Sequence, residues 1–130
     1  MSQPYIRKAV DWLLKHQNAD GGWGEDGATY WKERRYECKE STPSQTAWAV
    51  LGLMAAGEVE HTAVKRGIDY ITAAPREEDG RWQEPWFTAV GFPRVFYLRY
   101  HGYAAIFPLW ALARYKNLKS SNTKAVRYGM

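Results

Sequence analysis

One pattern occurs twice along the chain, in residues 8–23 and 66–82, at a spacing of about 59 residues. Each copy has a basic residue, a small residue and then an aromatic–aliphatic pair, and each closes on Asp-Gly-x-Trp. The closing residues are Trp23 and Trp82. A repeat of this length has room for a helical hairpin, and one hairpin cannot bury both of its faces alone. The repeat therefore predicts a single domain of stacked helical hairpins, with an all-α fold.

The spacing of the apolar residues predicts four helices and the loops between them. The expected helices are residues 5–17, a segment from Pro43 to Gly57, residues 62–73 and a segment within residues 103–117. Ser41 or Thr42 can cap the second helix, and Pro43 suits its first turn because the missing N–H costs nothing there. Pro108 either begins the regular part of the last helix or kinks it. Residues 25–40 are expected to form a long loop, and no segment alternates with the period of a strand.

Charge is unevenly distributed: all 14 acidic residues lie within residues 1–84, and the remainder of the chain carries only basic ones. A basic end can attract the phosphate of nucleic acid or of anionic lipid, or it can be a solvated tail. Nucleic-acid binding is disfavoured because the basic residues are a minority among apolar side chains. No segment reaches the roughly 20 apolar residues of a membrane-spanning helix.

The chain offers none of the usual metal or cofactor motifs. Its single cysteine, Cys38, cannot form an internal disulfide, and with no signal-peptide pattern a cytoplasmic location is expected. The three histidines, His16, His61 and His101, are scattered without the spacing of metal ligands. Neither a glycine-rich phosphate loop nor a nucleophile motif occurs. The sequence therefore predicts no metal and no cofactor.

Residues 91–110 combine many aromatic side chains with no carboxylate. The rings in this segment are Phe92, Phe96, Tyr97, Tyr100, Tyr103, Phe107 and Trp110. Such a run can form a hydrophobic core, a nucleic-acid platform, a membrane-facing surface or a pocket for a cation. Spacing alone favours the core, since aromatic stripes usually are buried.

Three motifs in order resemble the triterpene cyclase family. Gln17, Gly21 and Trp23 match its QW motif, while residues 41–49 and 91–117 resemble the C-terminal part of squalene–hopene cyclase. The resemblance implies a fragment of an α/α barrel of helical hairpins. It would comprise residues 1–130 as one domain, with repeat-like units at about 5–57 and 62–117 and a basic tail at 118–130.

The second repeat departs from the family pattern. Where the motif has a glutamine before the turn, this sequence offers Ala74-Pro75. In the family, that glutamine is thought to tie one helix end to the next motif's tryptophan. Its loss predicts a looser second turn, with a structural role for Gly80 and Trp82.

Members of the family cyclise squalene to pentacyclic triterpenes, including hopanoids, through carbocations in a large apolar cavity. The resemblance implies that Phe92 and Phe96 are rings that stabilise late cations. Further residues implied to line or shape the same cavity are Tyr97, Leu98, Tyr100 and Tyr103, with Tyr97 and Tyr103 open between cavity and core. Phe92 and Phe96 are four apart, so they are expected on one face of a helical turn, with Arg94 and Arg99 directed away from it.

The proton donor of the family is absent from this chain. The donor is the middle aspartate of an Asp-x-Asp-Asp motif, which does not occur here, and the acidic clusters at 25–26 and 77–79 are interpreted as solvated charge. No catalytic residue is therefore assigned, and the chain is expected to be inactive alone. The family relation implies peripheral attachment to the inner face of the cell membrane. Expected partners are an apolar isoprenoid such as squalene, the missing cyclase portion, or a second copy. The alternative is a non-catalytic hairpin module that binds an apolar lipid or a partner protein.

Overall fold

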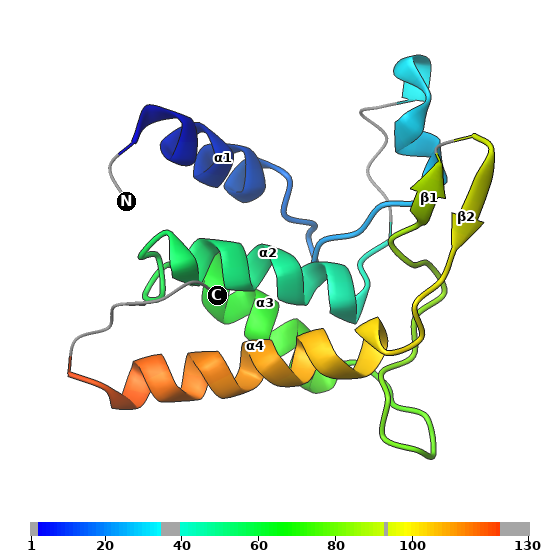
Figure 1. Ribbon diagram of the computed structural model, residues 1–130. Helices are drawn as coiled ribbons and strands as arrows, with labels where there is room; N and C mark the ends of the chain where they lie inside the picture. Colours follow the sequence, from blue (N-terminus) through cyan, green and yellow to red (C-terminus); the bar gives the residue numbers. More distant parts are fainter. Residues whose placement is uncertain (1–2, 35–39, 93, 123–130) are drawn as a thin grey trace.

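The computed structural model describes residues 3–34, 40–92 and 94–122. The described residues form four α-helices, which are α1 (Pro4–Lys15), α2 (Pro43–Ala55), α3 (Thr62–Ala73) and α4 (Tyr103–Ser120). They also form two short 3-10 helices, η1 (Gly27–Tyr30) and η2 (Lys32–Arg34), and an antiparallel hairpin of β1 (Val90–Phe92) and β2 (Phe96–Leu98) (Figure 1). The prediction of a mainly helical fold is confirmed. The helices of the described segment do not close into a barrel.

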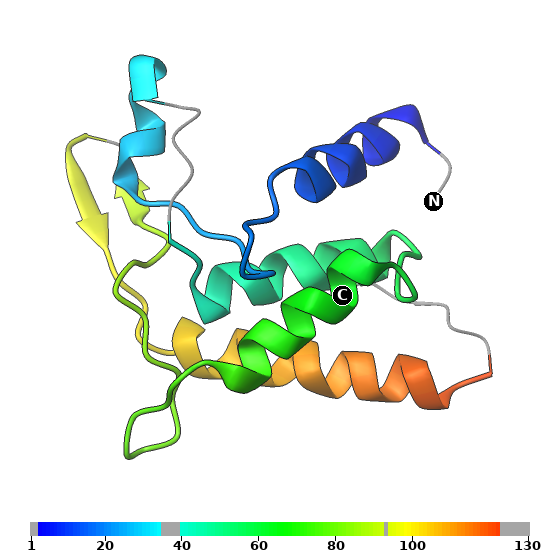
Figure 2. The same cartoon turned by 180° about the vertical axis from the view of Figure 1, so that it is seen from behind.

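Helix α2 is the centre of the core. It lies between α1 and α4 and packs against α3 and α4 (Figures 1 and 2). As predicted, Pro43 opens the helix, and the cap is Thr42, whose side chain accepts a hydrogen bond from the Gln45 amide. The largest fully buried side chains come mainly from α2 and α3 and include Leu51, Leu53, Met54, Ile71, Val50 and Val64.

Helix α4 excludes one of the two alternatives for Pro108, that the proline begins the helix. The proline lies inside one continuous helix and is buried, so it does not begin the helical segment. The helix also continues to Ser120, beyond the expected end at residue 117, and Leu118 is buried. The first residues of the predicted tail therefore belong to α4, and residues 123–130 lie outside the described residues.

The β-hairpin corrects the expectation that the chain has no strand and that Phe92 and Phe96 share a helical turn. Each strand has only three residues, which is too short for a period-two pattern to stand out. The segment expected as a loop at 25–40 contains η1 and η2, while residues 35–39, including Cys38, lie outside the described residues.

The two repeats share one turn geometry. In each turn, the first residue's amide donates to the fifth residue's carbonyl, at 2.9 Å in residues 18–22 and 2.7 Å in residues 77–81. Gly21 and Gly80 hold the same position, with φ values of +92° and +84° that favour glycine. The sequence repeat is therefore also a structural repeat.

A buried tryptophan follows each turn and secures the helix before it. The indole nitrogens of Trp23 and Trp82 donate to the carbonyl oxygens of Leu13 and Ile71, both at 2.8 Å. Each acceptor is the third residue from the end of its helix, within the last turn, where carbonyl groups lack the regular bond to an amide four residues later in the helix. Each turn is thereby fixed to the end of α1 or α3.

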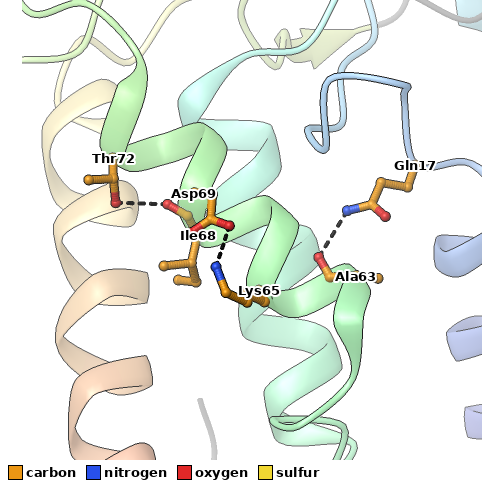
Figure 3. Close-up of polar contacts among 6 residues, drawn as sticks. All are labelled: Gln17, Ala63, Lys65, Ile68, Asp69 and Thr72. Carbon is orange, nitrogen blue, oxygen red and sulfur yellow. Dashed lines mark hydrogen bonds and ion pairs between the residues drawn. The ribbon is translucent and has the colours of Figure 1, made fainter.

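Gln17 ties the first turn to the next repeat. Its side-chain amide donates to the carbonyl oxygen of Gly21 at 2.8 Å. It also donates to the carbonyl oxygen of Ala63 in α3 at 2.9 Å, as Figure 3 shows. Because residues 77–81 are equivalent to residues 18–22, the residue equivalent to Gln17 is Arg76. The expectation that Ala74-Pro75 stands at the glutamine position was therefore wrong. The Arg76 guanidinium lies 3.9 Å over the Trp82 ring and makes no equivalent link to a following helix among the described residues.

Candidate functional site

Phe92 and Phe96 form a pair of rings on the hairpin. They are register partners on β1 and β2, and their ring centroids lie 5.4 Å apart in an edge-to-face arrangement. Phe92 is 66% exposed and Phe96 46% exposed, so neither ring is covered within the described chain. The cross-strand pairing, rather than helical spacing, brings the two rings together.

Arg94 turns the chain between the two strands. Its φ of +65° is uncommon for a residue with a side chain, and its amide donates to the Tyr97 hydroxyl at 2.7 Å. Its guanidinium lies 5.4 Å from the ring of Trp31. The backbone and side chain of one residue therefore fix the tip of the hairpin.

The loop after the first repeat supports this hairpin from the side. Tyr30 of η1 stacks on Tyr97 with centroids 5.9 Å apart, and its hydroxyl donates to the Ala89 carbonyl oxygen at 3.2 Å. Together with the contact between Arg94 and Trp31, these interactions hold the ring pair against a segment some 60 residues earlier in the chain.

Arg99 also has its own aromatic partner. Its guanidinium lies 5.2 Å from the Phe87 ring and donates to the Glu84 carbonyl oxygen at 3.2 Å. Both arginines interleaved in the aromatic segment thus contact rings other than Phe92 and Phe96. Leu98 ends β2 and is half-exposed.

Tyr100 and Tyr103 belong to a second group of rings, between α2 and α4. Trp48 of α2 meets Tyr103 and Phe107 edge-on, at centroid distances of 5.3 and 4.9 Å. Tyr100 stacks on Tyr103 at 5.3 Å, and Phe107 continues to Trp110 at 6.2 Å. Phe107 also packs against the core cluster, so this group joins the core to the surface. The six residues that the resemblance assigns to the cavity therefore lie in two groups. One is on the hairpin and holds Phe92, Phe96, Tyr97 and Leu98, and the other lies beside α2 and α4 and holds Tyr100 and Tyr103.

The sequence interpretation missed four aromatic residues that hold these groups, namely Tyr30, Trp31, Trp48 and Phe87. Tyr30 ends η1, while Trp31 and Phe87 lie outside the helices and strands, and none of the three belongs to a segment with a hydrophobic period that would give a signal. Trp48 lies in α2 and is half-buried, and its place within residues 41–49, which resemble the cyclase, is the signal that could have indicated it.

Glu84 links the second loop to the start of α2. Its carboxylate accepts a hydrogen bond from the Ser44 amide in the first turn of the helix. Burial raises the pKa of Glu84 above its usual value, and the hydrogen bond to Ser44 opposes this only in part.

The raised pKa predicts how stability changes with pH when Glu84 is replaced. A carboxyl with a raised folded-state pKa contributes stability below its ordinary pKa, and this contribution is lost as the pH rises through the raised value. We subtract the unfolding free energy of the unaltered chain from that of Glu84→Gln. This difference should be more favourable to the variant at about pH 7 than at about pH 4. Urea unfolding at both pH values measures this, with Glu33→Gln on exposed η2 as control. An equal difference at both pH values would contradict the prediction.

The described residues supply neither a metal centre nor a membrane span. No group of three or more histidine, cysteine, aspartate or glutamate side chains within them could hold a metal ion. Nor is any helix in this part of the chain both long and apolar enough to cross a bilayer.

Two helical hairpins closed by buried tryptophans, with aromatic rings on the connecting loops, define a repeat-built helical domain. The family model of the squalene–hopene cyclase C-terminal domain matches residues 1–117. The chain belongs to this family, which confirms the prediction drawn from the QW pattern and residues 91–117.

Curated relatives include two bacterial squalene–hopene cyclases and a human lanosterol synthase. The chain is 59% identical over 128 residues to a squalene–hopene cyclase of Bradyrhizobium diazoefficiens, covering 98% of this chain and 19% of that protein. It is 56% identical over 126 residues to a squalene–hopene cyclase of Zymomonas mobilis, covering 96% of this chain and 19% of that protein. Human lanosterol synthase is 37% identical over 114 residues, or 87% of this chain and 15% of that enzyme. The chain thus spans about a fifth of its bacterial relatives.

Proposed function

We propose that this chain is the C-terminal portion of a squalene–hopene-type cyclase and forms part of the wall of its apolar cavity. The observation that carries the proposal is the Phe92–Phe96 pair, held edge-to-face on a hairpin that Tyr30 and Trp31 support. In the complete protein, squalene would be folded against this wall and cyclised through carbocations to pentacyclic triterpenes.

The chemistry of the segment suits this role. An aromatic face attracts a cation through its quadrupole, by roughly 2 kcal/mol or more when desolvated. A carboxylate beside the ring would instead trap or deprotonate the cation, and residues 85–130 contain none. The interleaved arginines would repel a cation, but both guanidinium groups contact other rings. The pair therefore offers stabilisation without a competing nucleophile.

The uncovered helix faces support the proposal that the domain is part of an α/α barrel. On α4, Ile106, Leu109 and Trp110 lie at helical spacing on one face and are 59%, 63% and 38% exposed. Apolar side chains gathered in this way usually meet another surface. The remaining hairpins of a cyclase would cover them. Peripheral attachment to a membrane is proposed on the family relation alone.

Initiation requires an acid that the described residues do not supply. Asp79 is exposed, and hydrogen bonds from the backbone and side chain of Arg81 lower its pKa, which keeps it ionised. Glu84, whose pKa is raised, is bound to the start of α2. The proton donor must therefore come from another part of the protein.

We accordingly expect the isolated chain not to cyclise squalene. Purified protein is incubated with squalene and detergent, and the products are analysed by gas chromatography with mass spectrometry. The complete cyclase of Bradyrhizobium diazoefficiens serves as the positive control. Pentacyclic product above the level of a protein-free sample would overturn the proposal that the proton donor lies in another part of the protein.

A further inference from the structure

We propose that Gln45, in the first turn of α2, is a positioning residue that sets where Phe92 and Phe96 lie. Its buried side-chain amide joins two connections of the chain, residues 24–31 and 83–89, to one point at the start of the helix. The first connection carries the aromatic residues that support the hairpin, and the second leads into β1. The inference rests on the proposed function, in which the ring pair is part of the cavity wall, and it adds the residue that places this wall.

The Gln45 side chain pairs with the backbone of one residue in the first connection. Its oxygen accepts a hydrogen bond from the Glu25 amide at 3.0 Å, and its nitrogen donates to the Glu25 carbonyl oxygen at 3.1 Å. Because the Glu25 amide can only donate, this pair fixes which side of the Gln45 amide carries the oxygen. Gly24 allows the close approach, since a Cβ there would lie 1.9 Å from the Glu40 carbonyl oxygen just before α2.

The same amide also reaches the second connection. Its nitrogen donates to the Thr88 hydroxyl at 3.2 Å, and its oxygen accepts from the hydroxyl of Thr42, the cap of α2, at 2.8 Å. All four hydrogen-bonding positions of the Gln45 amide are thereby used, and the residue is only 8% exposed. An amide held in this way keeps one orientation, because any movement would leave a buried polar group unpaired.

The far end of the hairpin is tied to the same turn of α2. Arg99, which follows β2, donates to the Glu84 carbonyl oxygen at 3.2 Å, and the Glu84 carboxylate accepts from the Ser44 amide. The chain is therefore held at the start of α2 both before β1, through Thr88, and after β2, through Glu84. Thr88 is two residues from Val90, the first residue of β1, so a shift of this anchor is carried directly into the strand.

The start of α2 also holds the second group of rings. Trp48, three residues after Gln45, contacts Tyr103 and Phe107 edge-on. Because both groups are anchored to one helix, the contacts of Gln45 set how far the hairpin rings lie from the rings beside α4. Such spacing matters for a reaction, since a misplacement of about 1 Å can cost on the order of 100-fold in rate.

Substitutions at the two ends of the contact test this role. Gln45→Met removes the whole amide at similar length, but it also leaves the Glu25 backbone unpaired and so costs stability. Thr88→Val is therefore the decisive variant, because it removes only the hydroxyl from a half-buried side chain of the same shape. Thr88→Ser keeps the hydroxyl and should behave as the unaltered chain does. Thr72→Val is the matched control, since it makes the same change on α3, where the hydroxyl donates to the Ile68 carbonyl oxygen (Figure 3).

Hydrogen–deuterium exchange in this chain measures the contact without any reaction. Thr88→Val should speed exchange of peptides covering residues 83–98 about fivefold, the effect of losing one hydrogen bond, and leave residues 62–73 unchanged. Gln45→Met should speed exchange in residues 24–31 as well. Equal exchange of residues 83–98 in Thr88→Val and in the unaltered chain would overturn the proposal that Gln45 holds the hairpin.

The product profile of a complete cyclase tests the positioning role. In the Bradyrhizobium diazoefficiens enzyme with this chain in place of its matching segment, Thr88→Val should raise incompletely cyclised products about fivefold relative to pentacyclic product. Total consumption of squalene should change less than about twofold, since initiation is proposed to occur elsewhere. A merely structural role would lower total consumption and leave the product ratio unchanged.

Phe96→Ala, measured in the same enzyme, distinguishes this inference from the proposed function. A changed ratio with Phe96→Ala but not with Thr88→Val would refute the positioning role of Gln45 and leave the cavity wall in place. An unchanged ratio with both variants would refute the cavity wall and the positioning role together. A change of the same size with Thr88→Ser or with Thr72→Val would also count against the role, because neither substitution breaks the contact to Gln45.

Discussion

A chain carrying Trp23→Ala is expected to lose about 3–5 kcal/mol of unfolding free energy, the usual cost of removing a buried tryptophan. Trp23 is 5% exposed and belongs to the core cluster formed with residues of α1, α2 and α3. Its indole secures the Leu13 carbonyl at the end of α1, and its amide donates to the Thr46 hydroxyl of α2 at 2.9 Å. The substitution keeps the backbone amide but removes the indole, so it would free the end of α1 and leave a cavity in the core cluster. Because small domains have only about 5–15 kcal/mol in total, this loss would remove at least about a fifth of the unfolding free energy.

Urea unfolding followed by far-ultraviolet circular dichroism measures this loss. The matched control is Trp12→Ala, since Trp12 is 58% exposed on α1 and packs mainly on His16. That change should cost about 1 kcal/mol or less. Trp82→Ala should resemble Trp23→Ala, because the second indole makes the equivalent contact to Ile71. Equal unfolding midpoints for Trp23→Ala and Trp12→Ala would contradict the structural account of the turn.

The helices could be predicted from the sequence because their signals are local. Apolar spacing and caps define each helix within a few residues, as Thr42 and Pro43 do for α2. Gly57, which was expected to end that helix, has a φ of +95°, as a residue after a helix often does. The end of α4 was underestimated because polar residues after 117 continue the helix while Leu118 is buried.

The hairpin and the division of the rings could not be predicted in the same way. Short strands carry too few residues to show a period, and their pairing is set by contacts distant in sequence. Tyr30 with Tyr97 and Trp31 with Arg94 are such contacts. Spacing therefore indicated a rich aromatic segment but placed Phe92 and Phe96 on a helical turn instead of across two strands.

We expect Phe96→Ala to raise incompletely cyclised products in a complete cyclase by about 30-fold relative to pentacyclic product. The figure follows from losing roughly 2 kcal/mol of cation stabilisation at one ring, since each 1.36 kcal/mol changes a rate tenfold. The ring is 46% exposed in this chain, so its loss should disturb folding far less than it disturbs the product ratio. Phe96→Trp keeps an aromatic face and should restore most of the pentacyclic product.

The most direct measurement is the product profile of a chimera, analysed by gas chromatography with mass spectrometry. In it, this chain replaces the matching segment of the Bradyrhizobium diazoefficiens cyclase, with which it shares 59% identity. We predict mainly pentacyclic product from the unaltered chimera and from Val95→Ala, an exposed change on the same hairpin, and a shift to incompletely cyclised products only with Phe96→Ala. A chimera that folds yet makes no pentacyclic product, or an unchanged profile with Phe96→Ala, would contradict the proposal that this hairpin forms part of the cavity wall.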